Sequence, residues 1–235
     1  MTKSHVISIQ VGLPQTLGVK GASDPMDRPW TTGFFKTPIE EKIWLGLTNL
    51  VGDGQADLKN HGGVEKAVLA YAAEHYPIWR EGLQLPDLSY GAFGENLTIA
   101  DQTESSVCIG DIYDLGEAQI QVSQPRQPCW KLSRRWRIRN LALQVQKNGR
   151  TGWYFRVLKE GNIEPNQPLI LRDRPYPQWT VTRANQIMHQ EKNNKESAAK
   201  LAACPLLASN WQLTLSRRAK KSINPDTAKR LWGKN

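Results

Sequence analysis

The segment that decides the expected fold is Gln119-Ile120-Gln121-Val122-Ser123-Gln124-Pro125-Arg126-Gln127-Pro128-Cys129. Polar and apolar residues alternate from Gln119 to Ser123, and a period of two is typical of a half-buried β-strand. Pro125 and Pro128 then stop the strand, because proline has no backbone N–H to give to a ladder. The sequence therefore predicts a strand, a stiff loop and a cysteine held at the end of that loop.

Further short strand patterns, separated by glycine turns, occur along the first three quarters of the chain. They lie at residues 6–11, 43–51, 107–113, 153–158 and 169–171. Helical spacing is present only at residues 74–81 and 138–147. Many short strands with few helices predict a mainly β fold with helices, a closed or nearly closed β-barrel over residues 1–173.

The pattern changes after Asp173. The segment Arg174-Pro175-Tyr176-Pro177 is typical of a stiff linker, because each proline biases its predecessor toward extended geometry. Beyond the linker, helical patterns occupy residues 180–190, 196–203 and 209–221. The sequence predicts a small all-α three-helix domain over residues 174–235.

The composition limits the class of protein. The chain has 235 residues, 39% hydrophobic content and a formal net charge of +9, which favours anionic partners. No apolar run approaches the ~20 residues that span a bilayer, and the N-terminus lacks the regions of a signal peptide. Three cysteines without a CxxC pair predict neither a disulfide framework nor a four-thiolate zinc site. We therefore expect a cytoplasmic protein with no membrane partner.

Cys129 is the leading candidate for chemistry. Arg126 supplies positive charge that lowers a thiol pKa, and the thiolate is the form that attacks or ligates a metal. The alternative is an inert core cysteine, the role that we assign to Cys108 and Cys204. The sequence leaves open which histidine approaches the Cys129 thiol: His5, His61, His75 or His189.

Two glycine-containing loops are further candidates. Asn60-His61-Gly62-Gly63 with Lys66 can offer backbone amides and a charge to an oxyanion. Phe93-Gly94-Glu95-Asn96 can place amide and carboxylate groups at a pocket wall. Each loop, taken alone, is also explained by a plain turn. Arg150 and Trp153 form a weaker cluster at a helix-to-strand turn.

A run of cations interleaved with Trp130 and Trp136 follows the Cys129 loop. Its members are Arg126, Lys131, Arg134, Arg135, Arg137 and Arg139. Basic residues mixed with aromatics can bind nucleic acid, line a pocket for a phosphorylated cofactor, or form a solvated face.

These segments, in this order, resemble the MOSC domain, the family named for the C-terminal domain of molybdenum cofactor sulfurase. The closest resemblance is to its stand-alone YiiM-like members, and it covers nearly the whole chain. The residues that carry it are Asn60-His61-Gly62-Gly63, Lys66-Ala67, Phe93-Gly94-Glu95-Asn96-Leu97, Gly110-Asp111, Gln121 to Cys129, and Gly149-Arg150-Thr151-Gly152-Trp153. The tail that ends in Arg230-Leu231-Trp232-Gly233-Lys234 resembles the three-helix domain of the same subfamily.

The resemblance implies a MOSC-type β-barrel that binds the molybdenum cofactor (molybdopterin) in a cleft, with Cys129 on the molybdenum. It also implies reduction of N-hydroxylated compounds, such as 6-hydroxylaminopurine, to amines, which detoxifies them. The implied catalytic residues are Cys129, His61, Glu95 and Asn96, with Asp111 as a further candidate for proton transfer. The implied cofactor-binding residues are Asn60, His61, Gly62, Gly63, Lys66, Phe93, Gly94, Gln124, Arg126, Arg150 and Trp153.

The expected partners are a small N-hydroxylated substrate and a separate electron-donor reductase. A separate donor is expected because the chain has no cysteine cluster for an iron–sulfur centre. The tail could be a lid, a homodimer interface or a docking site for the donor, and the reaction is expected to need no pyridoxal cofactor.

Two alternative functions stay open. One is a sulfur transferase that carries a persulfide on Cys129. The other is a basic nucleic-acid-binding module without catalysis, although no helix-turn-helix, zinc-finger or RNA-recognition signature supports it, so nucleic acid is not the expected partner.

Overall fold

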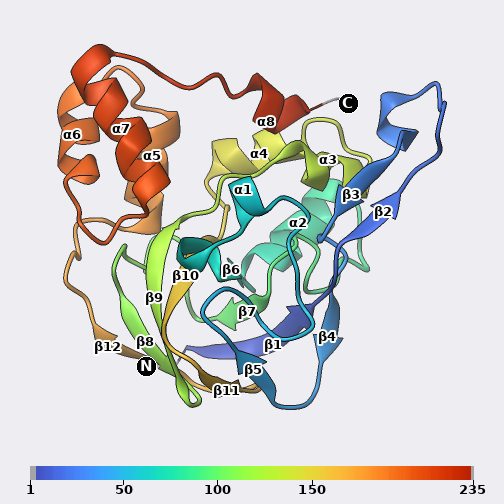
Figure 1. Ribbon diagram of the computed structural model, residues 1–235, viewed down its shortest axis with the longest axis horizontal. Helices are drawn as coiled ribbons and strands as arrows, with labels where there is room; N and C mark the ends of the chain where they lie inside the picture. The colour runs from blue at the N-terminus through green and yellow to red at the C-terminus, as the bar shows by residue number, and fades with distance from the viewer. Residues whose placement is uncertain (1–3, 234–235) are drawn as a thin grey trace.

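The computed structural model describes residues 4–233, so Lys234 of the tail motif lies outside the described residues. Its main element is an eight-stranded sheet with the order β12-β8-β9-β10-β6-β7-β1-β4 (Figure 1). Neighbouring strands are antiparallel except β6 and β7, which are parallel. In chain order, these strands are β1 (His5–Val11), β4 (Thr37–Ile39), β6 (Val68–Ala72), β7 (Leu97–Ala100), β8 (Ile112–Leu115), β9 (Ala118–Pro125), β10 (Trp153–Lys159) and β12 (Leu169–Asp173).

Two small ribbons complete the β-structure. They pair β11 (Gly161–Ile163) with β5 (Ile43–Leu45), and β2 (Gln15–Leu17) with β3 (Trp30–Thr32). The strand predicted at residues 119–123 is confirmed as the middle of β9, but it is not half-buried: Gln121 and Ser123 are buried along with Ile120 and Val122, because β9 lies between β8 and β10 and both of its faces are covered. Residues 43–51 form a strand only as far as Leu45.

The mainly β class with a helical tail is confirmed, but the sheet is not a closed barrel. Residues Ile9–Val11 of β1 pair with β4, so only the start of β1 faces the segment that precedes β12. There, Val6 N donates to Gln167 O at 3.0 Å and Leu169 N donates to Ser4 O at 2.9 Å. His5 and Pro168 between them form an isolated bridge that does not extend into a ladder.

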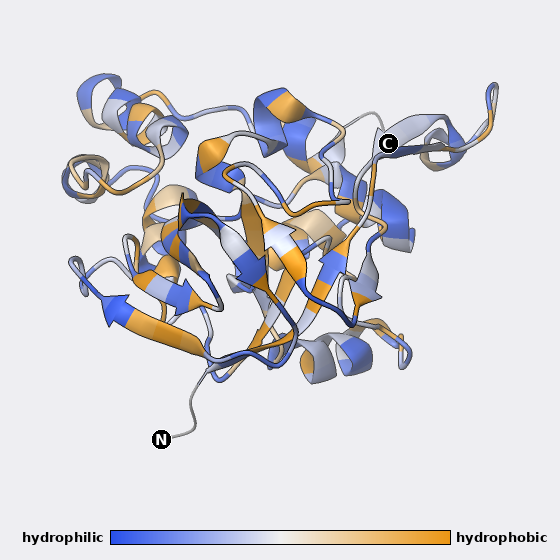
Figure 2. Cartoon of the chain, turned by 60° about the horizontal axis from the view of Figure 1, so that its bottom comes forward, coloured by the Kyte–Doolittle hydropathy of each residue, from blue (hydrophilic) through white to orange (hydrophobic). Residues whose placement is uncertain are grey.

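The sheet is covered by helices on one side of β6. All residues of β6 are buried, as expected for a central strand with packed faces. On that side, α2 (His75–Leu83) places Tyr76 and Trp79 against Phe93, in an apolar cluster that also includes residues of α3 (Trp130–Trp136) and α4 (Leu141–Asn148). Figure 2 shows the hydrophobic residues gathered on strands in the middle of the molecule.

The tail contains α5 (Val181–His189), α6 (Lys195–Ala202), α7 (Ser209–Lys221) and the short α8 (Ala228–Trp232). Residues of α5, α6 and α7 share one buried cluster with the sheet. Ala208 N also donates to Ser123 O of β9 at 2.9 Å. Because the helices complete the core of the sheet, the boundary at residues 173 and 174 stays a prediction. Across residues 4–233, no helix is both long and apolar enough to cross a bilayer.

Candidate functional site

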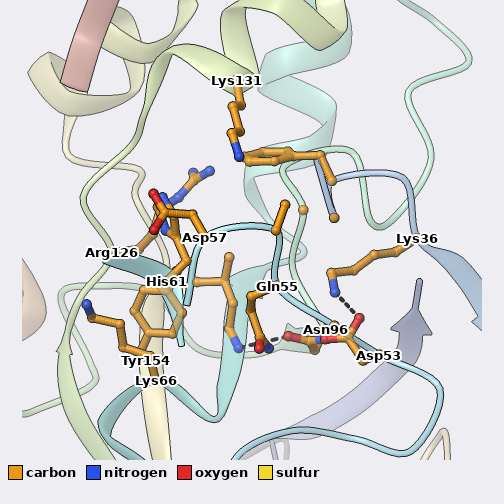
Figure 3. A pocket seen from close by; sticks show the side chains of 16 residues that line it. Lys36, Asp53, Gln55, Asp57, His61, Lys66, Asn96, Arg126, Lys131 and Tyr154 are labelled. Carbon is orange, nitrogen blue, oxygen red and sulfur yellow. Dashed lines mark hydrogen bonds and ion pairs between the residues drawn. The ribbon is translucent and has the colours of Figure 1, made fainter. Parts of the chain in front are cut away.

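A cavity opens beside the Cys129 loop, with an empty volume of about 570 Å³ including its mouth. Figure 3 shows Arg126, Lys66 and Tyr154 on one side and the Lys36–Asp53 pair on the other. The lining residues are Gly33, Phe34, Lys36, Asp53, Gly54, Gln55, Ala56, Asp57, His61, Lys66, Leu69, Gly94, Asn96, Arg126, Lys131 and Tyr154.

Cys129 is fixed at the junction of the loop and α3. It is the residue before the first turn of α3, and its carbonyl accepts from Leu132 N at 3.0 Å. Upstream, Arg126 N donates to Gly152 O at 3.0 Å, which ties the loop to β10. The Cys129 side chain is only 5% exposed, and its neighbours His61, Arg126 and Tyr154 are polar residues that line the cavity.

The surroundings of Cys129 favour the thiolate. Burial raises the pKa of this thiol, but a hydrogen bond with His61 and the charges of His61 and Arg126 outweigh it. Together with a hydrogen bond from Lys131 N, they lower the Cys129 pKa to about 7. His61 is thus the histidine that the structure brings to the thiol. By contrast, burial raises the pKa of both Cys108 and Cys204.

Arg126 has one hydrogen-bond donor unused among the described residues. It is 3% exposed; its Nη2 donates to Phe93 O at 3.1 Å, and its Nη1 is buried without a partner. The guanidinium lies over the Phe34 ring, 5.6 Å from its centroid. A buried, unpaired cationic donor at a cavity wall is suited to an anionic ligand.

The loop from Asp57 to Lys66 forms the rim. Asp57 caps the short helix α1 (Leu58–His61) by accepting from Asn60 N at 3.1 Å, and Lys66 Nζ donates to Asn60 O at 2.7 Å. Burial lowers the Lys66 pKa. Gly63 has φ 92°, and no described atom lies within 4 Å of the position where a Cβ would be. A ligand can therefore approach the backbone closely here.

The Gly91–Asn96 loop has a supporting role. Glu95 is fully buried and accepts from Gly91 N at 2.7 Å, Phe93 N at 3.1 Å, Thr98 Oγ1 at 3.3 Å and the Tyr76 hydroxyl. Glu95 therefore does not line the cavity but fixes the loop that does. Gly94, with φ 78°, lines the cavity, and a Cβ there would lie 2.8 Å from the Phe34 ring.

Asn96 connects the loop to an ion pair that the sequence did not predict. Its Nδ2 donates to Asp53 Oδ2 at 2.9 Å and to Gln10 O at 3.2 Å. Asp53 pairs with Lys36, whose pKa burial lowers despite the opposing effect of Asp53. The only sequence signal for Asp53 was a Gly-Asp-Gly turn, and Lys36 lies in a Gly- and Pro-rich stretch without periodicity.

Tyr154 was also missed, whereas Lys131, which lines the cavity, belongs to the cationic run for which the sequence allowed such a role. Burial raises the Tyr154 pKa to about 12, so its hydroxyl stays protonated over the physiological pH range. Tyr154 follows the predicted Trp153 and points to the opposite face of β10, which strand alternation could have indicated.

The other predicted residues do not line the cavity; Asn60, Gly62 and Gly63 belong to its rim loop only, and the rest are placed as follows. Phe93 is buried and stacks on Tyr71 with centroids 4.5 Å apart, and Trp153 is fully buried in the core. Gln124 is buried near the end of β9, and Arg150 lines a different cavity, beside His75. Asp111 is fully buried and pairs with Arg174 at 2.7 Å, close to Cys108.

The arginines of the cationic run mostly hold the N-terminal loops. Arg134 donates to Pro25 O at 2.5 Å and Arg28 O at 3.2 Å. Arg135 donates to Gly91 O at 2.8 Å, and Arg137 pairs with Asp27. Because these donors face the protein itself, they do not favour a nucleic-acid interface.

The residues present fit the molybdenum cofactor. Among the described residues, no three His, Cys, Asp or Glu side chains are grouped to hold a metal ion. The Cys129 thiol does not itself line the cavity, but it lies against His61, Arg126 and Tyr154, which do. A single thiolate at this wall suits a metal whose other sulfur ligands come with the cofactor. The unpaired Nη1 of Arg126 and the open space at Gly63 suit the cofactor's anionic part.

The comparisons with known proteins agree with this geometry. Residues 57–169 match the MOSC domain, and residues 179–221 match the YiiM-like 3-alpha helix domain. YflK of Bacillus subtilis is 44% identical over 213 residues, covering 91% of this chain and 93% of YflK. The crystal structure of YiiM from Geobacillus stearothermophilus has a TM-score of 0.76 and 36% identity, covering 92% of this chain and 99% of that one.

A protein of Gibberella moniliformis with the name "Reductase" is 37% identical over 179 residues. The match covers 75% of this chain but only 32% of the fungal protein.

Together, the sheet, the cation-lined cavity and the helical tail define a MOSC domain protein, a class built on a domain of the molybdenum-cofactor-binding type. Within that class, the chain belongs to the YiiM-like family with the three-helix tail.

Proposed function

We propose that this protein binds the molybdenum cofactor in the cavity and reduces N-hydroxylated compounds to amines. The observation that carries the proposal is Cys129, a thiol whose pKa is lowered to about 7 beside a cation-lined cavity. A thiolate at neutral pH is the species that ligates molybdenum.

The protein's own residues account for binding. Arg126 Nη1 and Lys66 Nζ supply positive charge to the anionic part of the cofactor, and the open space at Gly63 on the rim loop lets it approach the backbone closely, whereas Leu58 crowds Gly62. Glu95 holds the Gly91–Asn96 loop in place, so that Gly94 and Asn96 form the opposite wall.

The net reaction is R–NHOH plus two electrons and two protons to R–NH2 plus water. When bound, the molybdenum centre would supply the two-electron redox chemistry of this reduction. His61, hydrogen-bonded to Cys129 and lining the cavity, holds a proton beside the reacting centre. The Tyr154 hydroxyl stays protonated and can donate a hydrogen bond to the substrate.

The electrons come from a separate reductase, because the chain's three cysteines are spread through the structure and all three are free. The name of the Gibberella relative supports a reductive role.

The test compares protein made in hosts with and without molybdenum cofactor synthesis. We expect close to one molybdenum per chain only from the competent host, and reduction of 6-hydroxylaminopurine by that protein with an artificial reductant. Cys129→Ser should lose both metal and activity. Cys108→Ser, a buried cysteine outside the cavity, is the matched control and should keep both.

Full activity in metal-free protein would overturn the proposal. If metal-free protein instead carried a labile sulfur on Cys129 by mass spectrometry, the persulfide alternative would replace it.

A further inference from the structure

A second basic cavity lies between the helical tail and the Cys129 loop, and we call it the tail pocket. It is formed by the ends of α5 and α7, by α8, and by the strap of residues 222–227 that crosses the top of the molecule in Figure 1. Its empty volume is about 650 Å³ including its mouth, and Gln127 of the Cys129 loop forms part of its wall.

The charges that line the tail pocket are unbalanced. Lys192, Arg218 and Arg230 face it, and within residues 4–233 none of them forms an ion pair. The acidic group in the lining is Asp226, whose Oδ1 accepts from Ala228 N at 2.8 Å. Arg218 is buried, Arg230 is partly buried and Lys192 is exposed at the mouth. Desolvated cations without a counter-charge are costly, so an anion that enters the pocket is favoured.

Arg218 points to the same ligand through its hydrogen bonds. It is 1% exposed, and it donates to Ile187 O at 2.6 Å and Met188 O at 2.8 Å. These bonds satisfy two backbone carbonyls at the end of α5 and use both terminal nitrogens of the guanidinium. They leave Arg218 Nε buried and without a partner in the described part of the chain.

His189 adds a second unpaired atom, since its Nε2 is also buried without a described partner. Burial, assisted by the charges of Arg230, Lys192 and Arg218, lowers the His189 pKa to about 3. The ring is therefore neutral at physiological pH and can donate a single hydrogen bond to an acceptor in the pocket.

We propose that the tail pocket is a binding site for a tetrahedral oxyanion of the phosphate type, either free phosphate or the phosphate group of a small monoester. Such an ion supplies negative charge to Lys192 and Arg230 and acceptor oxygens to Arg218 Nε and His189 Nε2. The size and charge of the pocket suit this ligand, and nothing in the main cavity is needed for it.

Arg230 connects the tail pocket to the Cys129 loop. It donates to Pro128 O next to Cys129, and its Nη2 donates to Gln146 Oε1 at 2.6 Å. Burial lowers the Arg230 pKa to about 10, while the charge of Cys129 opposes that shift. An anion beside Arg230 therefore holds α8 against the loop that carries the thiol.

The test uses the full-length, metal-free chain. We expect sodium phosphate to raise its melting temperature, and sodium chloride at equal ionic strength not to. Lys192→Gln should weaken the apparent phosphate affinity about tenfold, since a charge-assisted hydrogen bond contributes roughly 1.5 kcal/mol. Lys220→Gln, which removes an exposed charge of α7 outside the pocket, is the matched control and should change the affinity less than about twofold.

Two further measurements decide whether the ligand is free phosphate or a phosphate monoester, and in which of the two cavities it binds. Tighter binding of a nucleoside monophosphate than of phosphate assigns the site to a monoester, and the reverse assigns it to the free ion. A phosphate effect that Lys66→Gln removes and Lys192→Gln does not would place the ion in the main cavity and overturn the proposal. Equal losses in Lys192→Gln and Lys220→Gln, or no effect specific to phosphate, would also overturn it. None of these outcomes depends on molybdenum or on reductase activity.

Discussion

The Gly91–Asn96 loop and the Gln124–Cys129 loop both meet the main cavity, and both carry buried polar side chains. In the first loop, the Glu95 carboxylate is satisfied by two backbone amides and two hydroxyls. In the second, Gln124 Oε1 and Arg126 Nη1 are buried without a partner among the described residues. In the first loop the Glu95 carboxylate finds all its partners inside the protein, whereas the second loop keeps unpaired atoms available to a ligand.

Whether a buried polar group is paired or unpaired distinguishes structural residues from ligand-binding residues better than the sequence motifs do. A buried group whose hydrogen bonds are all made inside the protein stabilises the fold, while an unpaired one needs an explanation such as a ligand. The cysteines follow the same division, since burial raises the pKa of Cys108 and Cys204 while polar neighbours lower that of Cys129.

The largest expected effect comes from removing the Glu95 carboxylate of the Gly91–Asn96 loop. Glu95→Ala would leave the amides of Gly91 and Phe93 and the Tyr76 hydroxyl buried without an acceptor. Breaking such a buried charged network costs about 3–5 kcal/mol in the free energy of unfolding. Urea denaturation measures it, with Glu74→Ala, an exposed carboxylate that also accepts a backbone amide, as control. Equal stability of the two variants would contradict the supporting role of Glu95.

The second expected effect concerns the pKa of the Cys129 thiol. Alkylation of Cys129 requires the thiolate, so its rate in the metal-free chain should rise with pH and reach half its maximum near the pKa of about 7. His61→Gln removes the hydrogen bond and charge that lower this pKa, which should therefore rise. We expect a midpoint about one unit higher and a rate at neutral pH up to about tenfold lower.

Mass spectrometry of peptides alkylated with iodoacetamide measures this rate for each cysteine separately. His5→Gln, which removes a half-exposed imidazole far along the chain from Cys129, serves as the control. An unchanged midpoint in His61→Gln would show that another group sets the pKa.

Local patterns in the sequence located most of the fold. Alternation found β9, a strand pattern beside a glycine turn found β10, and helical spacing placed α2, α4 and the main tail helices within a few residues of their ends. Closure of the barrel could not be judged in this way. It depends on which strand occupies the outer edge of β1, and that edge is shared between β4 and a proline-containing segment.

The part of the site that comes from loops with recognisable motifs was predictable from the sequence. His61, Lys66 and Arg126 belong to loops with recognisable residue types, and the structure brings all of them to the cavity. Lys36 and Asp53 come from irregular segments; Asp53 meets Asn96 across 43 residues of chain and pairs with Lys36 across 17. No local pattern encodes such contacts. The role of Glu95 was equally hidden, because its partners are backbone amides that any residue would supply.

The smallest expected effect gives the sharpest contrast, because it compares two glutamines on one strand. Gln121 donates to Gly110 O at 3.2 Å and accepts from Arg156 Nη1 at 3.1 Å, whereas Gln124 has an unpaired oxygen and one long bond to Pro125 O. Gln121→Leu should lower the free energy of unfolding by about 1–3 kcal/mol, since it removes the hydrogen-bond partner of Gly110 O and of Arg156 Nη1. Gln124→Leu removes an unsatisfied buried group and should change it by less than about 1 kcal/mol, in either direction. If urea denaturation gave Gln124→Leu the larger loss, the oxygen of Gln124 would have a partner in solution. Gln124 would then count as a structural residue like Glu95, and Arg126 Nη1 would be left as the unpaired atom, among the described residues of the Cys129 loop, that argues for a ligand.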